Sequence, residues 1–121
     1  MKEFVSSDTN MWFDFVEVEQ LAWPFRLRYL YLISRKTLND EINDPPELKS
    51  DLLGLGIKPV DLNERDWREL VVCSEKYGKR LSRYDLAALA IAKTREIPLL
   101  TGDGALRKAA KKRGRRRLGN A

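Results

Sequence analysis

Residues 81–114 read LSRYDLAALAIAKTREIPLLTGDGALRKAAKKRG, and this stretch predicts a helix, a short strand and a second helix. Ser82 and Asp85 have the three-residue spacing of a helix-capping box, and most of the positions that follow up to Ala92 are apolar. A helix that is apolar on nearly all sides is expected to lie inside the protein rather than on its surface.

A short apolar run follows this helix, which Pro98 prevents from continuing. Residues 97–100 contain Ile97, Leu99 and Leu100, a pattern typical of a strand that is covered on both faces of a parallel sheet. The sequence TGDG then breaks the strand, and residues 105–113 indicate another helix. Asp103 is therefore expected where a strand turns into a helix, the place where open α/β sheets have their sites.

The rest of the chain repeats this alternation. The predicted strands cover residues 2–7, 27–33 and, weakly, 57–62, where Pro59 indicates a sheet edge. The predicted helices begin at residue 11 and cover 36–42, 46–55 and 63–78. The apolar face of the last of these is expected to contain Trp67, Leu70, Val71 and Ser74. Such alternation favours a three-layer α/β/α fold with a mostly parallel central sheet.

The composition restricts the chemistry that the 121-residue chain can perform, because it contains no histidine and a single cysteine. Ser-His-Asp triads, Cys-His pairs and ordinary zinc sites are thereby excluded. Cys73 follows two valines and is expected in the core rather than as a nucleophile. Hydrolytic chemistry would have to use carboxylates, lysine or a hard cation held by oxygen ligands.

Charge is divided unevenly along the chain. Residues 1–106 carry 15 basic and 18 acidic side chains, a formal net charge of −3, whereas residues 107–117 carry eight basic side chains and no acidic one. The basic segment could be a solvated helix end or an arm that binds phosphate groups. We expect one domain over residues 1–114 and a basic tail over 115–121. No long apolar run or leader is evident, so a cytoplasmic protein is expected.

Four acidic residues occupy similar places in the predicted fold. Asp8 and Asp103 directly follow strands, Asp85 lies in the first turn of a helix, and Glu41 lies a turn or two beyond a strand. Each could be only a capping or surface residue. Carboxylates that met at one sheet edge would repel one another unless a cation lay between them, and Mg²⁺ and Mn²⁺ prefer such oxygen ligands. Asp40 has a spacing that is also compatible with the place given to Glu41.

Several segments resemble the PIN-domain ribonucleases, a family that includes the toxins of many bacterial toxin–antitoxin pairs. The resemblance is carried by FVSSDTN at residues 4–10, Ile33-Ser34 leading to Asp40-Glu41-Ile42, LSRYDLAALA at 81–90 and PLLTGD at 98–103. These segments span residue 4 to about residue 110 in order. Family members continue into a further apolar strand, which residues 115–121 do not match. The sheet is therefore expected to lack its last strand and to expose an edge that favours self-association or a partner.

The resemblance implies a metal-dependent endoribonuclease. In that interpretation Asp8, Glu41, Asp85 and Asp103 form a pocket for Mg²⁺ or Mn²⁺, in which water is activated to hydrolyse RNA. Asn10 or Thr101 would orient ligands or water. If the basic tail does not hold RNA, Arg35, Lys36, Arg83 and Arg107 near the acidic edge are the residues expected to hold it instead. An antitoxin protein and a second copy of the chain are the further partners that the resemblance suggests.

A different class of function is compatible with the same residues. The chain could be a catalytically weak RNA-binding module of the same fold, in which the basic tail binds the nucleic acid. Metal-dependent cleavage that disappears in Asp8→Asn would distinguish the two. A receiver-like domain or a phosphatase is less well supported, because the sequence around Asp8 lacks the required acidic pair or Asp-x-Asp element.

Overall fold

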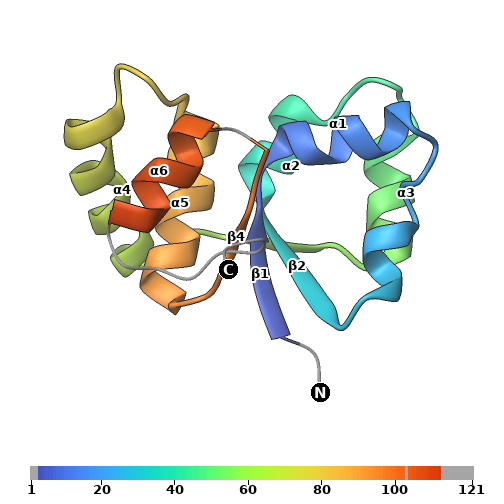
Figure 1. Cartoon of the computed structure of the whole chain (residues 1–121), viewed down its shortest axis with the longest axis horizontal. Helices are drawn as coiled ribbons and strands as arrows, with labels where there is room; N and C mark the ends of the chain where they lie inside the picture. The colour runs from blue at the N-terminus through green and yellow to red at the C-terminus, as the bar shows by residue number, and fades with distance from the viewer. Residues whose placement is uncertain (1–2, 103, 113–121) are drawn as a thin grey trace.

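The computed structural model describes residues 3–102 and 104–112, which form three layers, with helices on both faces of a central sheet (Figure 1). The fold class predicted from the sequence is confirmed. Asp103, one of the four expected metal ligands, and the basic tail from residue 113 onward lie outside the described residues. Within the described part of the chain, no helix has the length and apolar character needed to cross a membrane.

The sheet has four parallel strands in the order β3-β2-β1-β4. The strands are β1 (Glu3–Ser7), β2 (Tyr29–Ser34), β3 (Lys58–Val60) and β4 (Leu99–Leu100). β3 lies at an edge, as Pro59 predicted. β4 is shorter than the apolar run suggested, because only two of its residues pair with β1. Because all strands are parallel, their carboxyl ends meet at one edge.

Six α-helices and one short 3₁₀ helix connect and cover the described strands. They are α1 (Thr9–Glu17), η1 (Trp23–Arg26), α2 (Arg35–Glu41), α3 (Leu48–Leu55), α4 (Glu64–Tyr77), α5 (Arg83–Arg95) and α6 (Gly104–Lys112). Four of these helices have an N-cap residue whose side chain accepts a hydrogen bond from the backbone of the first turn. The N-caps are Asp8 for α1, Ser34 for α2, Asn63 for α4 and Ser82 for α5. These caps satisfy amide groups that a helix start otherwise leaves without partners.

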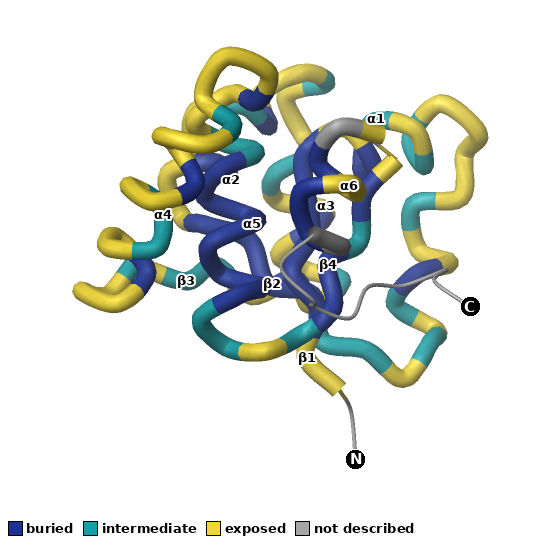
Figure 2. Tube along the Cα trace, turned by 60° about the vertical axis from the view of Figure 1, so that its left-hand side comes forward, coloured by how far each residue is buried: buried dark blue, intermediate teal, exposed yellow. Residues whose placement is uncertain are grey.

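The two faces of the sheet carry separate apolar cores. One core joins α1, α2 and α3 to β1 and β2 around Trp12, Tyr31 and Leu52. The other joins α4, α5 and α6 to β4 around Cys73, Leu89 and Leu106. Figure 2 shows that burial is concentrated on β1, β2 and α5, while α4 is exposed over much of its outer surface.

Helix α5 is buried from Leu86 to Lys93, which confirms the expectation drawn from its apolar sequence. It packs directly on the central strand β1, where the hydroxyl of Ser6 donates a hydrogen bond of 2.8 Å to the carbonyl of Ala88. Ser82 and Asp85 form the predicted capping box. The hydrogen bond thereby fixes Ala88, in the middle of α5, beside Ser6 near the carboxyl end of β1.

The predicted apolar face of α4 is confirmed for Leu70 and wrong for Trp67, Val71 and Ser74. Trp67 and Val71 are about half exposed and Ser74 is exposed, whereas the helix turns Asp66, Leu70, Cys73 and Tyr77 inward. Asp66 explains this orientation, because its buried carboxylate accepts hydrogen bonds from Thr94 (Oδ1, 2.5 Å) and from the guanidinium of Arg95 (Oδ1, 2.7 Å) on α5. An inward-facing acid thus determines which side of α4 faces α5.

Candidate active site

The carboxyl edge of the sheet brings together the segments that follow all four strands. Residue pairing places Ser6 of β1 opposite Leu32 of β2 and Leu99 of β4. Two residues further along each strand, Asp8 therefore lies between Ser34 on one side and Thr101 on the other. A backbone hydrogen bond of 3.3 Å from the amide of Asp8 to the carbonyl of Leu100 continues the pairing to this point. The edge is thus a rigid base for side chains from three strands.

Among the three proposed acids that the structure describes, Asp8 is the most buried, with 2% of its surface exposed. Its Oδ1 atom accepts a hydrogen bond of 3.2 Å from the amide of Met11, which makes it the N-cap of α1. Its Oδ2 atom accepts a hydrogen bond from the hydroxyl of Thr101. The capping interpretation is therefore correct, and the contact with Thr101 additionally fixes the carboxylate at the sheet edge.

Glu41 lies next to this position. The hydroxyl of Thr9, the residue after Asp8, donates a hydrogen bond of 2.6 Å to Glu41 Oε1. The contact joins the last residue of α2 to the first residue of α1. Groups from β1, α2 and the end of β4 therefore meet at one place.

Asp40 takes part in a different set of contacts, directed toward α5. Its Oδ2 atom accepts a hydrogen bond of 3.0 Å from the hydroxyl of Tyr84 and lies 3.0 Å from Lys36 Nζ. Hydrogen bonding to Lys36 and then to Tyr84 lowers the pKa of Asp40 below its ordinary value. Of the two adjacent acids that the sequence left open, Glu41 is the one hydrogen-bonded beside Asp8.

Asp85 occupies the position that the capping interpretation predicted. Its amide donates a hydrogen bond of 3.1 Å to Ser82 Oγ, and its Oδ2 atom accepts one of 3.1 Å from the amide of Ser82. Across the described ranges, which omit Asp103, no group of three or more Asp, Glu or Cys residues is arranged to hold a metal ion. The structure therefore bonds Thr101 to Asp8 and bonds Glu41 to Thr9, the residue after Asp8, but it does not bring Asp85 into a three-carboxylate cluster with these acids.

Asp14 is a candidate that the sequence analysis missed. A Cβ atom placed on Gly102 would lie 3.9 Å from Asp14 Oδ2, so this exposed carboxylate lies close to Gly102. The signal that could have identified it is its spacing, because Asp14 follows Asn10 by four residues and shares its helix face. Asn10 is itself exposed on the first turn of α1.

The basic residues expected near this edge have different surroundings. Arg107 of α6 donates a hydrogen bond of 2.9 Å from Nη2 to the carbonyl of Thr101, which places it next to the candidate site. Arg83 donates one of 3.0 Å to the hydroxyl of Tyr84, and this contact raises the pKa of Arg83 above its ordinary value. Arg35 pairs with Asp61 at 3.1 Å. Of the three, Arg107 contacts a residue that is itself hydrogen-bonded to Asp8.

The oxygen atoms at this edge are of the kind that bind a hard cation. Asp8 and Glu41 contribute carboxylates, and the hydroxyls of Thr9 and Thr101 support them with hydrogen bonds. Mg²⁺ is usually held by one or two protein carboxylates, with water and substrate oxygens filling its remaining positions. Asp8 and Glu41 are therefore the described carboxylates that could hold such a cation at this edge.

Comparison with protein-family models finds no match for this chain, and comparison with curated proteins finds none either.

Proposed function

We propose that the protein is a Mg²⁺- or Mn²⁺-dependent endoribonuclease of PIN-domain type, a hydrolase that cleaves RNA phosphodiester bonds. The observation that carries the proposal is the position of Asp8. It is a nearly buried carboxylate at the carboxyl edge of a parallel sheet, held by Thr101 and adjacent to the contact between Thr9 and Glu41. The motif resemblance described above supplies the family and the substrate class.

Each residue has a distinct part in the proposed reaction. Asp8 and Glu41 would hold the cation, with Asp85 and Asp103 as the further acids that the resemblance implies. Thr101 would keep the Asp8 carboxylate oriented, because it donates to Oδ2 from the neighbouring strand. The bound cation would offset negative charge on the phosphate and activate water for its hydrolysis. Arg107, which contacts the Thr101 carbonyl, is placed to attract the RNA backbone.

The proposal extends to biological context through the same resemblance. PIN-type toxins act on RNA in the cytoplasm and are neutralised by a protein antitoxin, so we include an antitoxin and a second copy of this chain as candidate partners.

The direct test of the function is cleavage of a labelled single-stranded RNA with Mn²⁺ or Mg²⁺ and with EDTA. Wild-type protein should cleave only with the cation, and Asp8→Asn should abolish cleavage while the protein stays folded. Asp51→Asn, which removes an exposed acid of α3 that is not part of the candidate site, is the matched control and should remain active. Cleavage that persists in Asp8→Asn would refute the assignment of the site.

A second candidate function has its own supporting observation. The Asp85 carboxylate accepts the Ser82 amide in a capping box, a role that it can fulfil without any metal. If capping is its whole role, the chain would be an RNA-binding module with weak or no catalysis. Binding of RNA in EDTA together with no cleavage in Mn²⁺ would identify this alternative.

A further inference from the structure

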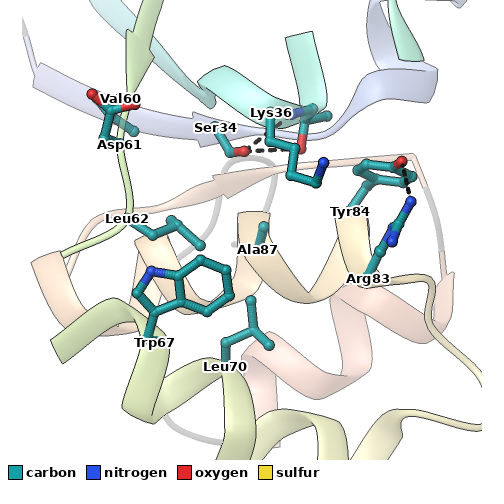
Figure 3. A pocket seen from close by; sticks show the side chains of 11 residues that line it. Ser34, Lys36, Val60, Asp61, Leu62, Trp67, Leu70, Arg83, Tyr84 and Ala87 are labelled. Carbon is teal, nitrogen blue, oxygen red and sulfur yellow. Dashed lines mark hydrogen bonds between the residues drawn. The ribbon is translucent and has the colours of Figure 1, made fainter. Parts of the chain in front are cut away.

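A groove of about 450 Å³ opens on the α4–α5 side of the carboxyl edge (Figure 3). Its apolar wall is formed by Leu62, Trp67, Leu70 and Ala87, and its opposite rim carries Lys36, Arg83 and Tyr84. Ser34, the last residue of β2, also lines it. Because β1 and β2 are neighbouring strands about 4.8 Å apart, the groove begins close to Asp8.

Trp67 is the unusual member of the groove. Its residue surface is 51% exposed, although tryptophan is among the side chains that gain most from burial. The α4–α5 interface does not use it, since α4 is anchored there by Asp66, Leu70, Cys73 and Tyr77. Figure 3 shows the indole beside Leu62 and Leu70, with one part of its ring open to the groove. A large flat ring is thus presented to whatever enters.

The rim adds positive charge beside this ring. Among the described residues, Arg83 takes part in no ion pair. Its guanidinium donates a hydrogen bond to the hydroxyl of Tyr84. The two acids near the rim, Asp40 and Asp61, are each paired with a base, Lys36 and Arg35 respectively. The local balance of these five side chains is one positive charge, which suits a phosphate-bearing ligand better than an acidic or a wholly apolar one.

We propose that this groove is a base-stacking subsite for single-stranded RNA. One base lies against the indole of Trp67 and the apolar side chains beside it, while Arg83 contacts a flanking phosphate. Aromatic stacking combined with a basic border is the usual means by which proteins hold single-stranded nucleic acid. The inference takes RNA as the ligand from the proposed function. It adds the place at which an RNA strand that leaves the acidic edge is held.

The test is the affinity for a fluorescein-labelled single-stranded RNA, measured by anisotropy in EDTA so that no turnover occurs. Trp67→Ala and Trp67→Leu should each weaken binding by about tenfold, whereas Trp67→Phe should stay within about threefold of wild type, because stacking needs an aromatic ring. The dependence of affinity on salt should be unchanged in all three, since no phosphate contact is lost. Trp67 is half exposed, so thermal unfolding should confirm that each variant remains folded.

Trp23→Ala is the matched control, because Trp23 is also about half exposed but belongs to η1, which packs with β2 and α1 on the opposite face of the sheet. Equal affinity of Trp67→Ala and wild type would overturn the subsite. So would equal affinity of the Leu and Phe variants, which would mean apolar packing without stacking. If Trp67→Ala left RNA binding intact but abolished self-association in sedimentation, the groove would be a protein interface and the proposal would fall.

The two proposals fail separately. Trp67-dependent binding in EDTA by a protein that cleaves no RNA in Mn²⁺ would refute the nuclease function and retain the subsite. Metal-dependent cleavage that is lost in Asp8→Asn, together with an RNA affinity that does not change in the Trp67 variants, would support the nuclease function and refute the subsite.

Discussion

Replacing Asp8 by asparagine and by alanine separates its structural role from its proposed metal role. Asp8→Ala removes the N-cap of α1, which costs about 1 kcal/mol, and removes the acceptor of the buried Thr101 hydroxyl, which costs about 1–2 kcal/mol. The sum of about 2–3 kcal/mol corresponds to a fall in melting temperature of about 8–12 °C for a domain of this size. Asparagine caps helices as well as aspartate does and retains an oxygen for the Met11 amide. We therefore expect Asp8→Asn to unfold near the wild-type temperature.

Without metal, Asp8→Asn should be slightly more stable than wild type, because neutralising one acid relieves its repulsion of Glu41. With Mn²⁺ at about 100 times its dissociation constant, wild type should gain about 2.7 kcal/mol, and Asp8→Asn should gain little. The assay is thermal unfolding in EDTA and in Mn²⁺ at constant ionic strength, with Asp51→Asn as control. The reasoning is refuted if Asp8→Asn loses as much stability as Asp8→Ala, or if Mn²⁺ stabilises Asp8→Asn as much as wild type.

Three further predictions concern the second acid, the α4–α5 contact and the basic tail. Glu41→Gln should reduce RNA cleavage more than tenfold and Asp40→Asn far less, because only Glu41 is hydrogen-bonded to the residue after Asp8. Initial rates of cleavage would measure both effects. A larger loss in Asp40→Asn than in Glu41→Gln would move the site to Asp40. Asp66→Asn should lower stability by about 1–3 kcal/mol at pH 7. Burial alone would raise the pKa of Asp66, but hydrogen bonds from Thr94, Asn63 and Arg95 outweigh it and lower that pKa below the ordinary value of 3.8. The contribution should therefore be complete above about pH 5 and be lost as the pH falls through the lowered pKa, which urea unfolding of wild type and variant across pH would measure; a difference that does not change with pH would contradict it. Truncation after Gly114 removes three arginines and should reduce the slope of log affinity against log salt by about two to three units in metal-free RNA binding, whereas equal slopes would mean that the tail makes no phosphate contacts.

Much of the fold was predictable because local signals and packing agree. The spacing of Ser82 and Asp85, the apolar sequence after them and the break at Pro98 predicted the buried helix and the strand that follows it. The parallel sheet followed from the alternation of strands and helices, and the edge position of β3 from Pro59. These features depend on residues close together in the sequence.

The orientation of α4 was not predictable in the same way. Its apolar residues favoured a face through Trp67 and Val71, but the buried Asp66 receives hydrogen bonds from Thr94 and Arg95, which lie 28 and 29 residues further along the chain. Hydrophobic periodicity cannot detect a buried acid whose partners are distant in sequence.

The candidate site was likewise predictable from the sequence only in part. The position of Asp8 at a strand exit was evident from the sequence, and the structure places it there as expected. The contacts that distinguish Glu41 from Asp40 involve Thr9 and Tyr84 and required the folded chain. Asp14 was missed because only the packing of α1 against the turn after β4 brings it near Gly102.

The most direct test of the metal site is anomalous diffraction from crystals of the wild-type protein grown with Mn²⁺. The account predicts an anomalous peak at the carboxyl edge of the sheet within coordination distance, about 2.1–2.2 Å, of oxygens from both Asp8 and Glu41. No peak at this edge under saturating Mn²⁺, or a peak bound only to acids elsewhere, would contradict the account.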